Sequence, residues 1–421
     1  MPEPTAPSLP KRVQNRARYL LLAGLVAVGM GQTVVFAVLA PLGREIGLSE
    51  VQVGAIISGS SVTFFIASPI WGRVSDRWGR RRVMLIGLLG YTVGTLIFAS
   101  VFRSALAGLL TPLPAFLALT LARMGQASVM SATPPAATAY MADITDVGTR
   151  TKGMGAIGAA NNVGAVIGPA LGGLLAAFSL LTPIYFAALV TFLAAIAVML
   201  GLPEPVKQVA AGRRERLRFT DPRILPFIIV GVMMFMGMAV VQQTLAFRLQ
   251  DVLELSAAGT ARAFGTAMML MALSSLLAQG VVVQRLDLPP LTLLRLAMPI
   301  LLTAFVVITL ADTRPFFLGG MAVLGFGMGL AAPAFMGGAS LAVGPEEQGA
   351  VAGVTSSCGP LGFTVGPLLG TALYQIHGQL PYLVTVMIYV PLLAFTFLLK
   401  LEDPTRGRVA AQPAEDDPPA P

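Results

Sequence analysis

The sequence has few charged residues and almost no cysteine or histidine. Only 11% of its 421 residues are charged, whereas a soluble globular protein carries about 25%. Such a chain cannot cover the surface of a soluble protein of this size, which disfavours a cytosolic enzyme and a disordered chain. The single cysteine, Cys358, excludes an intrachain disulfide, and the single histidine, His377, argues against a histidine-based proton relay. With 55% hydrophobic residues, 45 glycines and 31 prolines, the composition predicts an integral membrane protein.

Twelve apolar segments are long enough to cross a bilayer, which takes about 20 residues. A polar, arginine-rich stretch at 203–223 divides them into two sets of six, at 19–202 and 224–400. We therefore expect an all-α membrane protein with twelve transmembrane helices in two pseudo-symmetric six-helix bundles. The ends, 1–18 and 401–421, are rich in proline and polar residues and are expected to be disordered on the cytoplasmic side. The predicted spans are 19–42, 51–71, 83–102, 115–142, 153–177, 184–202, 224–247, 258–283, 291–311, 316–343, 350–375 and 381–400.

Basic residues predict the orientation. If both termini are cytoplasmic, that side holds most of the 28 Lys and Arg residues. The opposite side then holds only Arg44, Arg103, Arg248, Arg262 and Arg314. This asymmetry follows the positive-inside rule and predicts a multi-pass protein of the bacterial inner membrane with both termini in the cytoplasm. The net charge of +8 then reflects topology and contact with anionic lipid headgroups, and no nucleic acid partner is needed.

A glycine–proline pattern recurs in the two halves. It is G-x-x-x-G-P-x-x-G, and each copy lies in the fifth predicted span of its half. Matches at one offset in corresponding helices indicate an internal duplication, as in transporters built from two halves around a midplane site. The residues are Gly164, Gly168, Pro169 and Gly172 in the first half and Gly362, Gly366, Pro367 and Gly370 in the second.

The segment 72–82, GRVSDRWGRRR, lies between the second and third spans. Gly72 and Gly79 permit close backbone approach and unusual torsions, and Asp76 can cap a helix or pair with an arginine. Arginines alone would indicate only a cytoplasmic loop, but the Gly, Asp and Gly spacing is more specific. The segment resembles the loop signature of the major facilitator superfamily, G-x-x-x-D-R-x-G-R-R, and matches it at Gly72, Asp76, Arg77, Gly79, Arg80 and Arg81.

This resemblance implies a gating loop. Asp76 would pair with charged groups at neighbouring helix ends and hold an outward-open state until the pairing breaks. The natural partner is Asp143 with Arg150, where the fourth span leaves the membrane, in a segment that resembles tetracycline/proton antiporters. In the second half Gln284 takes the place of Asp76, so the repeated loop is degenerate.

The fifth span carries glycines four residues apart, which let a neighbouring helix approach closely. Pro169 frees a backbone carbonyl and can kink the helix. A lone G-x-x-x-G would indicate only packing. The full run resembles the signature of the exporter branch of the superfamily, which implies efflux rather than uptake, with Gly164, Gly168, Pro169 and Gly172 as its fixed residues.

Arg123 lies within the fourth predicted span among apolar and small residues. A charge there costs at least about 2.5–3.5 kcal/mol, so a functional role is the default; the alternative is an arginine that snorkels to the outer interface. Arg123 and Gln126 resemble the R-x-x-Q-G motif of drug/proton antiporters, with Ala127 in place of the final glycine. The resemblance implies a role in proton coupling or substrate binding.

None of the twenty acidic residues falls well inside a predicted span, and the first span offers Gln32 where many proton-coupled exporters hold a carboxylate. We therefore expect any proton site at a helix end, with Asp143 or Asp76 the better candidates and Asp251 the weaker. Arg123 then lacks a buried counter-ion, which an anionic substrate or Gln126 could supply. Other polar residues that could reach a central cavity are Asn161, Asn162, Gln242 and Gln243.

The leading hypothesis is a monomeric secondary active transporter that exports a small amphipathic molecule, a drug or a secreted metabolite, by proton antiport. One alternative is an exporter of an anionic carboxylate metabolite such as a siderophore, with Arg123 as the counter-charge. Another is a non-transporting membrane sensor. A membrane enzyme is disfavoured because the chain has no H-E-x-x-H, G-x-S-x-G or phosphate-binding loop. We expect no catalytic residues, cofactor or metal, and the alternating-access signatures argue against a channel.

Overall fold

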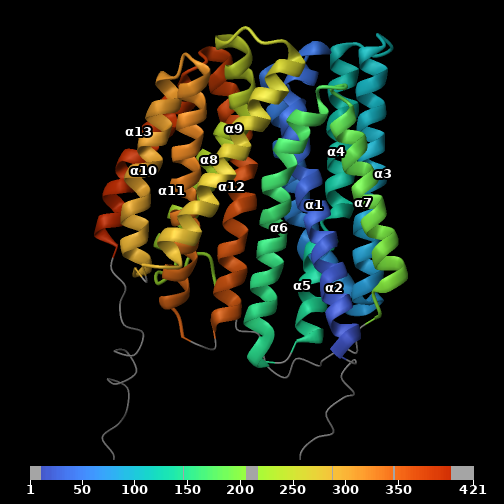
Figure 1. Ribbon diagram of the computed structural model, residues 1–421, viewed down its shortest axis with the longest axis vertical. Helices are drawn as coiled ribbons and strands as arrows, with labels where there is room; N and C mark the ends of the chain where they lie inside the picture. The colour runs from blue at the N-terminus through green and yellow to red at the C-terminus, as the bar shows by residue number, and fades with distance from the viewer. Residues whose placement is uncertain (1–10, 146, 205–216, 287, 345–346, 400–421) are drawn as a thin grey trace, which may run out of the picture.

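The computed structural model describes residues 11–145, 147–204, 217–286, 288–344 and 347–399. Within them the chain is helical and contains no strand (Figure 1). The first half comprises α1 (Lys11–Glu45), α2 (Glu50–Trp78), α3 (Arg80–Leu106), α4 (Pro112–Met130), α5 (Thr133–Ile144), α6 (Val147–Leu175) and α7 (Thr182–Gly201). The second half comprises α8 (Leu225–Val252), α9 (Ala257–Leu277), the π-helix η1 (Ala278–Val283), α10 (Pro290–Leu310), α11 (Arg314–Leu341), α12 (Gln348–Ile376) and α13 (Leu380–Leu398).

Eleven segments of the described chain are long and apolar enough to cross a membrane. They match eleven of the twelve predicted spans. The twelfth is α12, a 29-residue helix whose Pro360 and Pro367 lie inside it. The all-α membrane fold predicted from the sequence is thus confirmed.

Local signals explain where several helices begin. Ser49 and Gln52 form a reciprocal capping box at the start of α2, and Ser256 caps α9. Proline occupies the first turn of α4, α7, α8, α10, α11 and α13, where its missing N–H has no intrahelical acceptor to lose.

Two predicted segments differ in detail from the structure. The span 115–142 is found as one membrane span, Pro112–Ile144, but its helix is interrupted, because α4 ends at Met130 and α5 begins at Thr133. Pro134 and Pro135 cannot donate backbone hydrogen bonds, so the helix breaks ahead of them. Residues 11–18 are helical rather than disordered. Ala17 is fully buried there, which ties this extension of α1 to the bundle. The rest of the predicted N-terminal end, residues 1–10, the predicted tail 401–421 and most of the predicted linker, residues 205–216, lie outside the described residues.

The two halves form two bundles side by side, with the first half on the right of Figure 1 and the second on the left. Successive spans run in opposite directions, with α4 and α5 forming one span, and α1 begins and α13 ends toward the same end of the molecule (Figure 1). We call this the termini end and the opposite one the distal end. The 72–82 segment lies at the termini end, and the α1–α2 and α8–α9 connections lie at the distal end.

Packing repeats between the halves as the sequence duplication predicts. Within the bundles α6 packs on α1 and α12 packs on α8; between them α6 packs on α9 and α12 packs on α2. At both crossings a glycine lies against the carbonyl of the repeated proline. A Cβ on Gly265 would lie 2.6 Å from the Pro169 oxygen, and one on Gly54 would lie 2.8 Å from the Pro367 oxygen.

Candidate functional site

At the termini end, the 72–82 segment consists almost entirely of helix. Helix α2 runs to Trp78 and α3 begins at Arg80, so only Gly79 connects them. Its φ of +98° suits glycine, as expected. Gly72 is helical, and a Cβ on it would meet only Pro135, at 3.7 Å. The prediction that another backbone segment approaches Gly72 closely is therefore wrong.

Arg80 joins the two acidic residues that the sequence singled out. Its Nη1 lies 2.5 Å from Asp76 Oδ1 and its Nε lies 3.1 Å from Asp143 Oδ2. Nη1 also donates to Ser75 Oγ at 2.8 Å. Asp76 and Asp143 are thus brought together through Arg80, inside the first bundle. The Arg150 side chain, expected to take part, lies outside the described residues.

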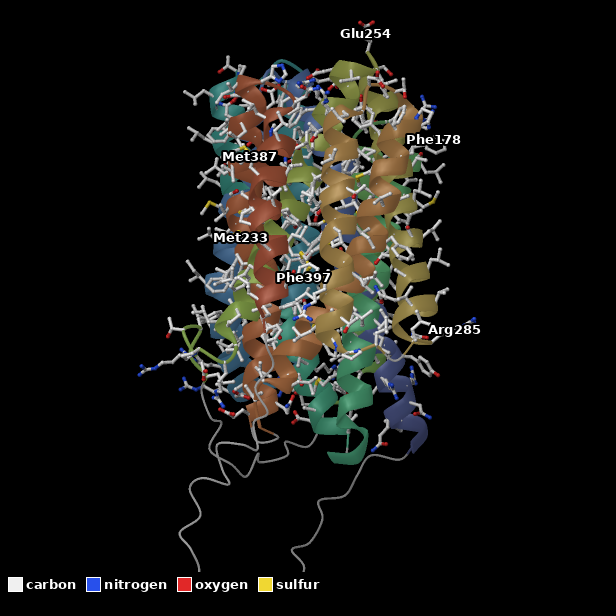
Figure 2. The ribbon with its side chains drawn as sticks, turned by 90° about the vertical axis from the view of Figure 1, so that its left-hand side faces the viewer. Phe178, Met233, Glu254, Arg285, Met387 and Phe397 are labelled. Atoms are coloured by element: carbon white, nitrogen blue, oxygen red, sulfur yellow. The ribbon has the colours of Figure 1, made fainter. Side chains whose placement is uncertain are left out.

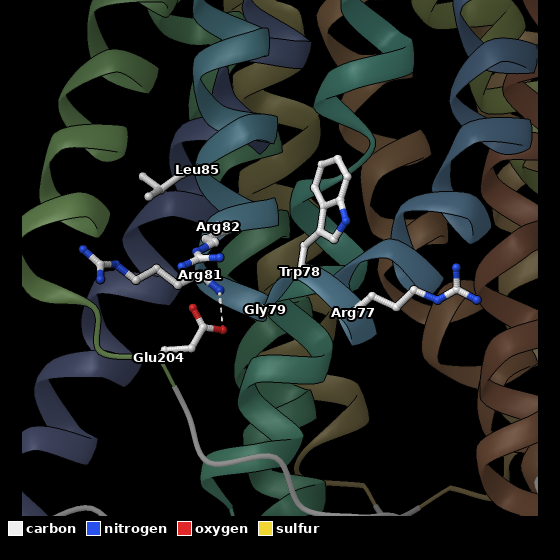
Figure 3. Close-up of a pocket in the computed structure, with 7 residues that line it drawn as sticks. All are labelled: Arg77, Trp78, Gly79, Arg81, Arg82, Leu85 and Glu204. Carbon is white, nitrogen blue, oxygen red and sulfur yellow. Dashed lines mark hydrogen bonds between the residues drawn. The ribbon is translucent and has the colours of Figure 1, made fainter.

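Arg81 contacts a residue that sequence reasoning missed, Glu204. The Arg81 backbone N–H donates to Glu204 Oε1 at 3.3 Å (Figure 3), and its guanidinium donates to the Met199 carbonyl. Tyr140 donates to the Pro203 carbonyl at 2.8 Å, so α3 and α5 both hold the start of the linker. The only sequence signal was an acid directly after the sixth span.

Arg123 is buried in the first bundle with 5% of its surface exposed, so the snorkelling alternative is wrong. Its Nη1 donates to Gln126 Oε1 at 2.5 Å, and Gln126 Nε2 donates to Thr95 Oγ1 at 2.5 Å. The guanidinium lies 5.8 Å from the ring centre of Phe98. Within the described chain no carboxylate pairs with Arg123, and its Nε has no hydrogen-bond partner.

At the distal end, an ion pair crosses between the bundles. Arg44 of α1 contacts Asp251 of α8 through two hydrogen bonds, of 2.5 and 3.0 Å. Arg44 also donates to Glu50 of α2 at 2.8 Å, and Tyr374 of α12 donates to Asp251 at 2.6 Å. We call Arg44, Asp251 and Tyr374 the distal latch. The sequence predicted Arg44 on the outer side and Asp251 at a helix end, but it carried no signal for their contact.

The two ends of the molecule differ in what their ion pairs join. Among the ion pairs of the described residues, only Arg44–Asp251 joins the two bundles. At the termini end, Arg80 pairs within the first bundle, and Arg223 pairs with Asp221 and Glu347 within the second, at 2.8 and 2.7 Å. Hydrogen bonds from Arg223 hold the pKa values of the Asp221 and Glu347 carboxyls below their ordinary range. Electrostatic contact between the bundles is thus confined to the distal end in the part of the chain described.

The glycines of the predicted exporter run pack α6 on α1. A Cβ on Gly172 would lie 2.8 Å from the Val34 oxygen, and one on Gly164 would contact the Val26 oxygen. Gly168 lies between them on the same face, against Met30 and its neighbours. The carbonyl of Pro169 faces Gly265 of α9 instead. The exporter run of α6 therefore contacts both its own bundle and the other one.

The remaining predicted residues are not gathered around Arg123. Gln32 is half-buried on α1, Asn161 is exposed on α6, and Gln242 and Gln243 are buried on α8. None of these four hydrogen-bonds Arg123, and Gln243 Oε1 has no partner among the described residues. The side chain of Asn162 lies outside the described part.

Both the sequence and the fold of this chain are similar to those of known proteins. The family model described as Major Facilitator Superfamily matches residues 21–362 and 295–421. Multidrug resistance protein 2 of Bacillus subtilis strain 168 is 26% identical over 397 residues, which are 90% of this chain and 94% of that protein. The class C tetracycline resistance protein of Escherichia coli is 35% identical over 177 residues, 41% of each chain. Among solved structures, an inward-facing, occupied bacterial homologue of the human lysosomal transporter Spinster superposes with a TM-score of 0.72 at 17% identity, over 93% of this chain and 97% of that one.

Proposed function

This chain belongs to the Major Facilitator Superfamily, and on that premise we propose that it exports small amphipathic drugs or metabolites by proton antiport. It is a multi-pass membrane transporter and not an enzyme. Support for efflux comes from its relatives, a multidrug and a tetracycline resistance protein, and from the exporter run on α6. Its proposed setting is the bacterial inner membrane, where it acts as a monomer with both termini cytoplasmic.

The distal latch is the observation that carries this proposal. Alternating access requires the bundles to separate at one end while they meet at the other. The Arg44–Asp251 pair joins them at the distal end, whereas the described ion pairs of the termini end stay within one bundle. With the termini end in the cytoplasm, the structure corresponds to the inward-facing state of the cycle.

The different contacts of the two carboxylates favour Asp143 over Asp251 as the proton carrier. A carrier in an antiporter must be protonated while the protein turns from outward- to inward-facing. Protonation of Asp251 would remove the charge that binds Arg44 and so weaken the inward-facing contact. Asp143 is paired with Arg80 within one bundle, so it can take up a proton from solvent and release the guanidinium, which stays charged, without opening the distal end.

The test is transport by the full chain in liposomes with an imposed pH gradient. Tetracycline and the cationic dye ethidium serve as probes, and Asp143→Asn is compared with Arg314→Gln, an exposed distal arginine outside the proposed machinery. We expect gradient-driven accumulation that Asp143→Asn abolishes and Arg314→Gln retains. If no gradient drives accumulation of either probe, proton antiport is refuted; if the chain moves no probe under any condition, it is the non-transporting sensor.

A second candidate function is export of an anionic carboxylate metabolite, siderophores among them. The observation that favours it is the buried Arg123, which has no carboxylate partner in the described chain. Citrate added to the same assay separates the two functions. Loss of citrate transport in Arg123→Gln with tetracycline transport retained supports the anionic substrate, and equal loss of both contradicts it.

A further inference from the structure

A cavity of about 550 Å³ opens at the corner between α2 and α3. It lies at the termini end, on the outside of the first bundle. Its lining includes Arg77, Trp78, Arg81, Arg82, Leu85 and Glu204. Figure 3 shows Arg81 and Arg82 near Leu85, Trp78 across from them, and Arg77 directed away.

The charges in this cavity are not balanced. Three arginines line it with one carboxylate, and Glu204 binds the Arg81 backbone N–H rather than a guanidinium. Arg82 is exposed and forms no hydrogen bond or ion pair with a described residue. Arg81 Nε is buried without a partner. Guanidinium donors are thus available for an anion between α3 and the end of α7.

An apolar surface leads from this cavity along α3. Leu85 lines the cavity, and Leu89, Val93 and Leu96 follow at helical spacing on the same face, 43%, 55% and 45% exposed. Trp78 is 57% exposed at the cavity mouth, where an amphipathic indole suits the membrane interface. Charge at one end of a continuous apolar face matches a phospholipid, with its headgroup at the arginines and its acyl chains along α3.

We propose that this cavity binds the phosphodiester headgroup of an anionic phospholipid, held by Arg81 and Arg82 with Trp78 at its side. Basic pockets between transmembrane helices are the expected sites for such headgroups. A free phosphate would use the same guanidinium donors but would leave the apolar face of α3 uncovered. The lipid is therefore the occupant that matches the whole surface.

The experiment measures lipid binding to the full-length protein in detergent by native mass spectrometry. Phosphatidylglycerol is compared with phosphatidylcholine, for wild type, Arg82→Gln and the matched control Arg285→Gln. Arg285 is an exposed arginine at the same end of the molecule (Figure 2), in the second half of the chain, and does not line the cavity. We expect tighter binding of phosphatidylglycerol, weakened about fivefold by Arg82→Gln, as one basic residue near a membrane surface contributes about 1 kcal/mol, and unchanged in Arg285→Gln.

Trp78→Phe provides a second variant, which removes the indole N–H and keeps the aromatic ring. It is expected to weaken phosphatidylglycerol binding less than Arg82→Gln does. Equal binding of the two lipids, or equal effects of Arg82→Gln and Arg285→Gln, would overturn the proposal. So would complete displacement of phosphatidylglycerol by excess inorganic phosphate, because the site would then recognise the phosphate alone.

Discussion

Removing the charge of Asp251 should open the distal end of the molecule. In Asp251→Asn, Arg44 keeps its hydrogen bond to Glu50 in its own bundle but loses the carboxylate of the opposite bundle. The Tyr374 hydroxyl also loses its ionised acceptor. The equilibrium between distal-closed and distal-open states should therefore shift toward the open one.

The size of this shift follows from the geometry of the pair. Two charges 4 Å apart attract by about 4 kcal/mol at the effective dielectric constant of a protein surface. The side chains of Arg44 and Asp251 are 23% and 46% exposed, so solvent screens much of this, and fully exposed pairs contribute about 0.2–1 kcal/mol. The two-point contact and the added tyrosine place the pair above that range. We expect about 1–2 kcal/mol, which changes the population ratio about five- to thirtyfold.

Distance measurement between spin labels on the two bundles is a direct assay. Leu109 and Leu310 are 76% and 71% exposed, lie near the distal end in different bundles, and accept cysteine labels. The buried Cys358 is replaced by alanine in this background. Electron–electron double resonance should show a longer distance population that grows in Asp251→Asn.

Glu50→Gln is the matched control, since it removes the carboxylate that Arg44 contacts within its own bundle. It should leave the distance distribution unchanged, because the pair with Asp251 remains. An unchanged distribution in Asp251→Asn would refute the reasoning, as would an equal opening in Glu50→Gln.

Three further outcomes are expected. Gly164→Ala should destabilise the protein by about 1–3 kcal/mol, because its Cβ would press on the backbone of α1. Gly155→Ala is the control, since a Cβ there has no neighbour within 4 Å, and it should leave the stability unchanged. Thermal unfolding of the two variants in detergent measures the difference. The stabilisation linked to the lowered pKa of Glu347 is complete above its ordinary value and is lost as the pH falls through the lowered one. Wild type should therefore lose slightly more thermal stability than Arg223→Gln between pH 7 and about pH 4, and equal losses would contradict this. Arg80→Lys, which cannot span two carboxylates with one planar group, should slow transport about tenfold in the liposome assay, as expected from one lost charge-assisted hydrogen bond of about 1.5 kcal/mol; an unchanged rate would contradict the bridging role.

The sequence indicated several residues that make polar contacts in the structure, but it did not predict all of their partners. It singled out Asp76, Asp143 and Arg123, and all three take part in polar contacts. It did not predict that Arg80 joins the two acids, because Arg80 is separated from Asp143 by 63 positions. Pro134 explains the break between α4 and α5 once the helices are seen, but the hydropathy of the segment conceals it.

The sequence by itself determined the membrane class, the helical spans and the duplication. These depend on local composition and on patterns repeated along the chain, which short-range physics converts into helices. Only the tertiary structure decided which end of the molecule is closed, because the distal latch joins Arg44 to Asp251 across 207 positions. The free energy of that contact depends on how the two bundles pack against each other. Local composition carries no information about the distance between Arg44 and Asp251 in the folded protein.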